Sequence, residues 1–217
     1  MVSGSWARYA PLSGLLFAVL LVVAIIVGGF DSVDSNDSVV KVVKYWHDND
    51  SEQMASAIIS AVAMVPFLWF LGVLRSRFQE AEGGSHRLAS TAFAGGIALA
   101  AFALVDSSLQ FATAESVGDI PPVATQTLSA LYNNFFFGFP VGVGVFQLAS
   151  GLVILRTGLL PRWLGWVAFV LGVVSFLGPI GFFASFLVFL WVAIVSVMLF
   201  QNQGPAAPAQ QTALPTS

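Results

Sequence analysis

The charged residues of this chain lie almost entirely between long apolar runs, and the connections that carry them alternate in sign. The basic connections hold six arginines, which are Arg8, Arg75, Arg77, Arg87, Arg156 and Arg162. The acidic connections hold Asp31, Asp34, Asp37, Asp48, Asp50, Glu52, Glu115 and Asp119. Lysine and arginine concentrate in the cytoplasmic loops of multi-pass membrane proteins. The alternation therefore predicts a polytopic membrane protein with a defined orientation.

The composition agrees with a membrane location. Of the 217 residues, 57% are hydrophobic and 9% are charged, whereas a soluble domain carries about 25% charged residues. The formal net charge of -3 argues against nucleic acid as a partner. The absence of cysteine excludes disulfides and thiolate chemistry. We expect the lipid bilayer as the main partner, together with another membrane protein or a second copy, and no cofactor.

Six apolar runs are candidates for membrane spans, each of which needs roughly 20 residues. They cover residues 11–30, 54–74, 88–112, 132–155, 163–177 and 180–200. We therefore predict an all-α, polytopic bundle of six transmembrane helices over residues 1–200. The fifth run is short, so the sequence does not fix its boundary with the sixth. A Pro-, Ala- and Gln-rich tail at 201–217 has no periodicity and is predicted to be disordered and cytoplasmic.

The first run has a competing interpretation as a signal peptide. A typical signal-peptide core has about 7–15 apolar residues and ends at an A-x-A-like site. This run is longer, and it ends in Gly28, Gly29, Phe30 and Asp31. The sequence therefore favours a retained helix.

The positive-inside rule then sets the orientation. Six spans place both termini on one side, together with the six arginines. The opposite side has Lys41 and Lys44 as its only cations. We expect a multi-pass protein of the plasma membrane with both termini in the cytoplasm.

Residues 31–53 form the extracytoplasmic loop of this topology. Asp37 or Ser38 is expected to cap a following helix. Val39, Val42, Val43 and Trp46 recur at helical spacing. This pattern predicts an amphipathic helix that lies at the membrane interface.

Small residues repeat along the third and fourth runs. Ala92, Gly96 and Ala100 are spaced by four, as are Gly138 and Gly142. Small residues at this spacing allow two helices to approach closely. The sequence leaves open whether these faces pack on each other or between two protomers.

Asp106 is the acid nearest to an apolar run, and acids inside membranes are often functional. Nineteen residues separate it from Arg87, about 28 Å of helix, which is close to the hydrocarbon thickness of roughly 30 Å. Asp106 is therefore expected near the outer interface. It has either an interfacial, structural role or a role in ligand binding.

Polar residues predicted at the same depth would complete a vestibule for a small ligand. Gln110, with Ser107 and Ser108, lies on the helix of Asp106, while Asn133 and Asn134 follow Tyr132 at the start of the fourth run. The alternative is that Asn133 or Asn134 caps that helix.

Gln147 is predicted deeper in the bilayer. It lies about 21 Å from Asn133 along a helix, which places it in the inner half of the membrane. An amide at that depth either hydrogen-bonds a neighbouring helix or contacts a substrate.

No catalytic or metal-binding motif is present. His47 and His86 fall on opposite sides of the predicted membrane, so they cannot share a metal. The sequence contains no GxSxG, Walker A or HExxH pattern. We expect neither an enzyme nor a metalloprotein.

Three stretches resemble, in the same order, a family of uncharacterised bacterial multi-pass membrane proteins classed under domains of unknown function. They are VVKVVKYWHDND at 39–50, FLWFLGVLRSRFQEAEGG at 67–84 and LRTGLLPRWLGWVAFVLGVV at 155–174. The resemblance implies about six helices and a bacterial plasma membrane. It implies no activity, and it assigns no site.

The expected function follows from these observations. The sequence favours a non-enzymatic integral membrane protein that binds a protein partner or a lipid. The alternative is a small transporter or channel, as one chain or an oligomer. In that case Asp106, Asn133, Asn134 and Gln147 would line the path.

Overall fold

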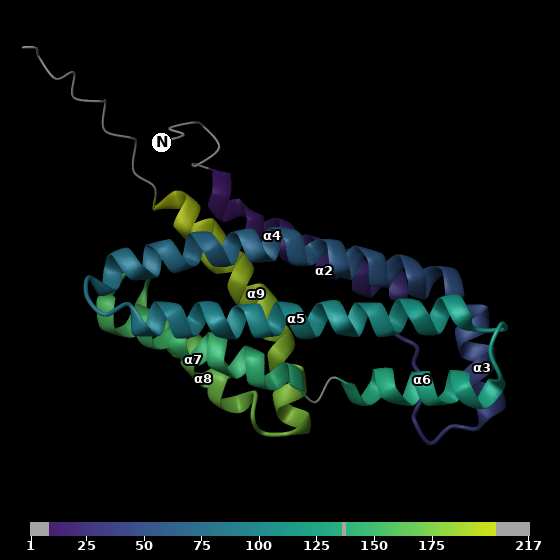
Figure 1. Ribbon diagram of the computed structural model, residues 1–217. Helices are drawn as coiled ribbons and strands as arrows, with labels where there is room; N and C mark the ends of the chain where they lie inside the picture. Colours follow the sequence, from purple (N-terminus) through teal and green to yellow (C-terminus); the bar gives the residue numbers. More distant parts are fainter. Residues whose placement is uncertain (1–8, 136–137, 203–217) are drawn as a thin grey trace, which may run out of the picture.

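The computed structural model describes residues 9–135 and 138–202, and these ranges are helical with no strand. The expected all-α fold is confirmed (Figure 1). The elements in chain order are η1 (Ala10–Leu12), α2 (Ser13–Gly28), α3 (Val39–Asp48), α4 (Asp50–Glu82), α5 (Arg87–Ser116), α6 (Pro122–Phe135), α7 (Phe139–Thr157), α8 (Arg162–Val174) and α9 (Pro179–Gln201).

Four stretches are long and apolar enough to cross a membrane, and they identify a membrane protein with transmembrane helices. They are Ala10–Gly28, Asp50–Glu82, Arg87–Ser116 and Pro122–Thr157. The outward face of α2 is apolar as well, since Leu16, Val22 and Ile26 are 53%, 54% and 64% exposed. Exposed aliphatic side chains of this kind are suited to contact with lipid tails.

The helices of the bundle pack mainly against their neighbours in the sequence. α4 packs on both α2 and α5, α7 packs on α5 and α8, and α9 packs against α2 and α8. Figure 1 shows α4 and α5 as a long antiparallel pair. Their 33 and 30 residues correspond to roughly 50 and 45 Å, more than the hydrocarbon thickness of about 30 Å. Both helices therefore reach beyond a bilayer.

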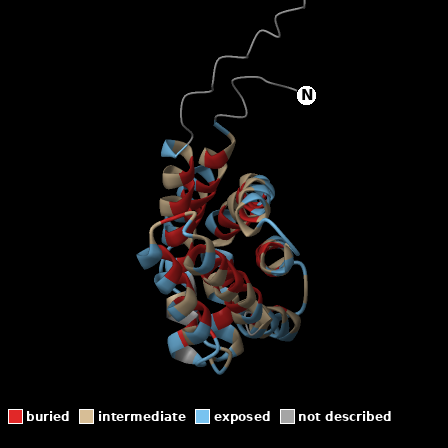
Figure 2. Cartoon of the chain, turned by 90° about the vertical axis from the view of Figure 1, so that its left-hand side faces the viewer, coloured by how far each residue is buried: buried red, intermediate tan, exposed pale blue. Residues whose placement is uncertain are grey.

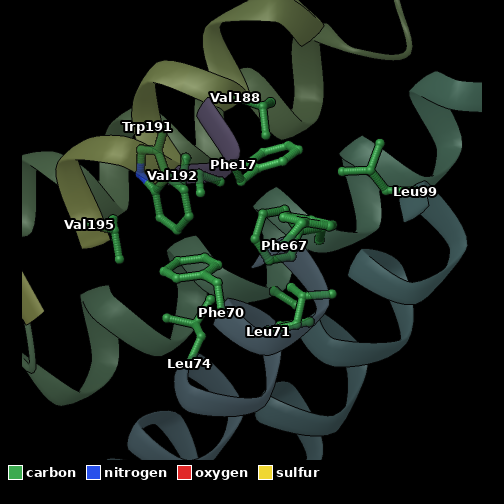
Figure 3. Packing of buried hydrophobic residues seen from close by; sticks show 14 of the residues in the cluster. Phe17, Phe67, Phe70, Leu71, Leu74, Leu99, Val188, Trp191, Val192 and Val195 are labelled. Carbon is green, nitrogen blue, oxygen red and sulfur yellow. The ribbon is translucent and has the colours of Figure 1, made fainter. Parts of the chain in front are cut away.

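The main core is aromatic and tightly packed. Phe67 and Phe146 are 0% exposed, and Phe17 lies with its ring centroid 4.5 Å from that of Phe67. Trp191 of α9 packs edge-on against Phe146, and its indole N–H donates to the Leu164 carbonyl over 3.1 Å. Figure 3 shows Phe17 of α2, Phe67 of α4 and Trp191 of α9 gathered in this core. Figure 2 shows buried residues on the inward faces of the helices.

Two glycines bring α5 and α7 into close contact. A Cβ atom added at Gly95 would lie 2.5 Å from the Phe146 nitrogen, and one added at Gly142 would lie 2.8 Å from the Leu99 nitrogen. The predicted small-residue face of the fourth run therefore packs on α5, since Gly138 meets Phe102 and Gly142 meets Leu99. The predicted face of the third run turns toward α4 instead, because a Cβ atom added at Gly96 would lie 2.5 Å from the Leu71 side chain. The antiparallel register, in which Gly95 meets Phe146 and Leu99 meets Gly142, also places Arg87 level with the last turn of α7, which carries Arg156.

A second, smaller core lies at the other end of α4 and α5. We call residues 29–48 and 122–135, which include α3 and α6, the α3–α6 layer. Its buried centre is formed by Val33, Val42 and Trp46 together with Ala114 of α5. The expected amphipathic helix is confirmed, because α3 buries Val42 and Trp46.

Ser38 caps α3, as expected, by accepting a hydrogen bond from the Lys41 nitrogen. The fourth run departs from its expected form. Helix α6 begins at Pro122, inside the segment expected to be a polar connection, because proline is favoured at the first helical position. Asn133 and Asn134 lie in the last turn of α6, so the prediction that one of them caps a helix start is wrong.

The last two runs form α8 and α9. With 13 residues, α8 is about 20 Å long, and this is shorter than the roughly 30 Å of a full crossing. Most of the predicted disordered tail, residues 203–217, lies outside the described residues. Arg8 also lies outside them.

Candidate functional site

A cavity of about 820 Å³ separates the main core from the α3–α6 layer. Its size is in the range of small-molecule binding sites, about 300–1,000 Å³. Seven helices, α2 to α7 and α9, and the 29–33 segment contribute to its wall. The residues that line it include Phe17, Leu21, Ile25, Gly28, Asp31, Val33, Tyr45, Trp46, Gln53, Ser56, Ser60, Met64, Leu99, Phe102, Ala103, Asp106, Ser107, Gln110, Tyr132, Asn133, Phe139, Phe186 and Phe189.

The wall changes from polar to apolar along α4. Gln53, Ser56 and Ser60 line the cavity in succession, and Met64 follows them. Residues three or four apart share one helix face, so side-chain polarity decreases continuously along this part of the wall. Gln53 and Met64 are about 16 Å apart on the helix axis. This length is about half of the hydrocarbon thickness of roughly 30 Å.

Helix α5 repeats the gradient in the opposite chain direction, as an antiparallel neighbour must. Gln110 and Asp106 line the polar end, Ala103 follows, and Leu99 lines the apolar end. The two long helices therefore share one polar end and one apolar end.

The apolar end is aromatic and closed by the main core. Phe17, Phe139 and Phe189 line it, with the Phe17 and Phe189 ring centroids 5.7 Å apart. Beyond Phe17 lies Phe67, which is fully buried. The cavity thus ends in a packed region without leading through it.

Three side chains organise the polar end through consecutive hydrogen bonds. Gln110 Nε2 donates to Gln53 Oε1 over 2.7 Å, in a buried contact between α5 and α4. Gln53 Nε2 donates to the Gly28 carbonyl over 2.8 Å and to the Tyr45 hydroxyl oxygen over 3.0 Å. The Tyr45 hydroxyl in turn donates to the Asp31 carbonyl over 2.7 Å. These bonds join α2, α3, α4 and α5.

Burial raises the pKa of the Tyr45 phenol, and the negative charge of Asp31 adds to this effect. Tyr45 therefore stays protonated and keeps its hydroxyl available as a donor. The bond to the Asp31 carbonyl depends on that proton.

Amides of α6 hold the 31–38 segment over the cavity. Asn133 Nδ2 donates to the Val33 carbonyl over 2.9 Å, and Gln126 Nε2 donates to the Asp37 carbonyl over 3.0 Å. These two backbone carbonyls lie outside any helix and have no intrahelical partner, so the α6 amides satisfy them. The segment is thereby tied to the bundle through α6.

Two polar groups at this end have unused capacity. Asp106 is half-buried and makes no hydrogen bond or ion pair with a residue of 9–135 or 138–202. Trp46 is 1% exposed, and its Nε1 finds no acceptor among the same residues. Unsatisfied groups of this kind are expected where a ligand binds.

The structure brings together three of the five predicted site residues, because Asp106, Gln110 and Asn133 all line the cavity. Asn134 lies outside it and donates to the Ser35 hydroxyl over 3.3 Å and to the Ala130 carbonyl over 2.7 Å. Gln147 is placed elsewhere, in the middle of α7.

Gln147 is 0% exposed, and neither atom of its amide has a partner in the described part of the chain. It shares a helix face with Gly144 and Gly151, three and four residues away, and both glycines contact α8. Gln147 thus faces the interface with α8, but the predicted hydrogen bond to a neighbouring helix is not formed among these residues.

Sequence reasoning missed Gln53, Ser56 and Tyr45 as parts of this site. Gln53 is the last residue of the predicted extracytoplasmic loop, Ser56 lies near the start of the second run, and Tyr45 lies in the helix predicted at the membrane interface. The signal was present as a row of polar residues from Gln53 to Ser60, spaced by three and four.

Among the described residues, no group of three or more histidine and acidic side chains could hold a metal ion. His47 lies on α3, while His86 precedes α5 at the other end of the bundle. No family model, curated protein or solved structure matches this chain.

Proposed function

We propose that this membrane protein is non-enzymatic and binds one lipid-like amphiphile in the cavity between the main core and the α3–α6 layer. The observation that carries the proposal is the graded wall. Gln53 and Gln110 line one end, Phe17 and Leu99 line the other, and the two ends are about one leaflet apart. A molecule with a polar head and an apolar tail matches that gradient.

The depth of the cavity in a membrane supports this ligand class. We propose a six-span protein of a bacterial plasma membrane, with both termini in the cytoplasm and with the 13-residue α8 as a span of less than full length. The register of α5 and α7 groups Arg87 and Arg156 at one end, as the positive-inside rule requires of a cytoplasmic end. Gln53 lies about 33 Å from Arg75 along α4, at the outer interface. A head group bound there would lie at the level of lipid head groups.

The side wall of the cavity supports exchange of the ligand with the bilayer. Ile25 of α2 and Phe186 of α9 line the cavity, yet they are 39% and 40% exposed. α2 packs against α4 and α9, while α6 packs against α3 and α5. We therefore propose that an amphiphile enters sideways from the bilayer, between the group of α2, α4 and α9 and the group of α3, α5 and α6. Its tail would remain in an apolar environment throughout.

The alternative, a small transporter or channel, has less support. Its path would have to continue from the apolar end toward the arginine-rich end. Phe67, Phe70 and Phe146 fill that region and are 0% exposed. A closed floor favours binding over conduction.

Native mass spectrometry after gentle extraction tests the binding proposal. The wild-type protein is expected to retain one amphiphile at a fixed ratio. Ala103→Phe adds a ring to the cavity wall and is expected to abolish retention. Ala94→Phe is the matched control, because Ala94 is an exposed residue of the same helix and does not line the cavity.

Equal retention by both variants, or a wild-type protein that carries no amphiphile, would overturn the proposal. A second protein chain present at a fixed ratio, without an amphiphile, would favour a role as a subunit of a complex.

A further inference from the structure

We propose that the amphiphile carries a positively charged amine head and that Asp106 is its counter-ion. This inference rests on the proposed binding function and specifies the chemical class of its ligand.

The first argument is the charge of the wall. Asp31 and Asp106 line the cavity, and no lysine or arginine of the described residues does. Of the two lysines of α3, Lys41 forms an ion pair with Asp37 over 2.8 Å, and Lys44 is not a lining residue of the cavity. A cationic head would meet only negative or neutral groups, whereas an anionic head would meet repulsion.

The second argument is the isolation of Asp106. Its neighbour Ser107 directs its hydroxyl to the Ala103 carbonyl over 2.8 Å, and Gln110 donates to Gln53. No donor in 9–135 or 138–202 is therefore assigned to the Asp106 carboxylate. A partly buried carboxylate is costly without a partner, and an ammonium group supplies both a compensating charge and hydrogen-bond donors.

The third argument is the aromatic surface beside these acids. Tyr45, Trp46 and Tyr132 line the polar end. The ring centroids of Trp46 and Tyr132 are 5.8 Å apart, and those of Tyr45 and Trp46 are 5.7 Å apart, both in edge-on arrangement. Aromatic faces attract ammonium groups by cation–π interaction.

Three probes with the same sixteen-carbon tail separate the head from the tail. They are hexadecylamine, hexadecanol and hexadecanoate, added to the full-length protein in a neutral detergent at pH 8 and measured by native mass spectrometry. An alkylamine is protonated there, as a lysine side chain is. We expect hexadecylamine to bind about tenfold more tightly than hexadecanol, and hexadecanoate more weakly than both.

Asp106→Asn is expected to remove the preference and to lower hexadecylamine affinity about tenfold, to the level of hexadecanol. Asp119→Asn is the matched control, because this exposed acid follows the same helix and does not line the cavity. It should leave the order of affinities unchanged.

Equal affinity for the three probes, or an unchanged preference in Asp106→Asn, would overturn the inference while leaving the binding proposal intact. Failure of all three probes to bind, together with no effect of Ala103→Phe on retention, would refute the binding proposal itself.

An ammonium head on an alkyl chain occurs both in membrane phospholipids and in single-chain amines. Competition with an excess of phosphatidylethanolamine distinguishes these sources. Displacement of bound hexadecylamine indicates the phospholipid, and retention of hexadecylamine indicates the single-chain amine. Either result supports the amine class.

Discussion

The contact between α5 and α7 should be intolerant of a single added methyl group at Gly95. An added Cβ would lie 2.5 Å from the Phe146 nitrogen and 2.9 Å from its Cα. Ordinary van der Waals contact begins at 3.4 Å, so the two backbones would have to separate by roughly 1 Å in a close-packed interior. Overpacking of this kind costs about 1–3 kcal/mol.

Gly72→Ala is the control with the opposite expected sign. Gly72 is exposed on α4, and a Cβ added there meets nothing within 4 Å. Replacing a helical glycine by alanine stabilises a helix by up to about 1 kcal/mol. We therefore expect Gly95→Ala to lower the free energy of unfolding and Gly72→Ala to leave it unchanged or raise it.

The assay is reversible unfolding of the purified protein by dodecyl sulfate in mixed micelles, followed by circular dichroism. The double variant Gly95→Ala/Gly142→Ala should lose less than the sum of its parts, because the first substitution already separates the helices. The reasoning would be refuted if Gly95→Ala were as stable as Gly72→Ala, since the two alanines differ mainly in what their Cβ atoms contact.

Four further predictions follow from the polar end of the cavity, the α3 cap and the proposed topology. Gln53→Leu should lower the free energy of unfolding by about 1–3 kcal/mol, because it leaves the buried Gln110 amide and the partly buried Gly28 carbonyl without their partner. Gln53→Leu/Gln110→Leu should cost less than the sum of the single changes, and additivity in the unfolding assay would contradict the coupling of Gln53 with Gln110. Since burial raises the pKa of Tyr45, its stabilising effect should be complete below the unfolded pKa of about 10 and be lost as the pH rises through the folded pKa. Tyr45→Phe should flatten this decline of the free energy of unfolding at alkaline pH. An unaltered pH profile in unfolding measurements would contradict the contribution assigned to Tyr45. Ser38→Ala should cost about 1 kcal/mol, seen as faster amide exchange in α3, whereas Ser35→Ala should leave α3 unchanged. Because the chain has no cysteine, an impermeant maleimide should label Asn36→Cys in intact cells and label Ser85→Cys only after permeabilisation; the reverse pattern would invert the proposed orientation.

Several features could be predicted from the sequence because they depend on local composition and spacing. The apolar runs predicted helices that are confirmed by α2, α4, α5 and α7, since a membrane leaves helices as the main way to satisfy the backbone. The Ser38 cap and the buried Val42 and Trp46 of α3 followed from side chains a few residues apart. Even the depth of Asp106 required only a count of residues along one helix.

The register between helices needed the tertiary structure. Gly142 was predicted to lie on a small-residue face, whereas Gly96 was predicted in place of Gly95, and only the packed α5–α7 pair shows that Gly95 and Gly142 each meet the backbone of the other helix. The start of α6 at Pro122 was also missed, because its polar residues lack the apolar periodicity of a span and gain their place by packing on α3 and α5.

The cavity combines both kinds of information. The sequence alone predicted that Asp106 and Gln110 lie about one turn apart on one helix and that the chain is a helical membrane protein. Only the tertiary structure decided that Gln53 and Tyr45 join them and that Gln147 does not. The physical reason is that rise along a helix is fixed by backbone geometry, whereas the direction in which each helix faces is fixed by the side chains of its neighbours.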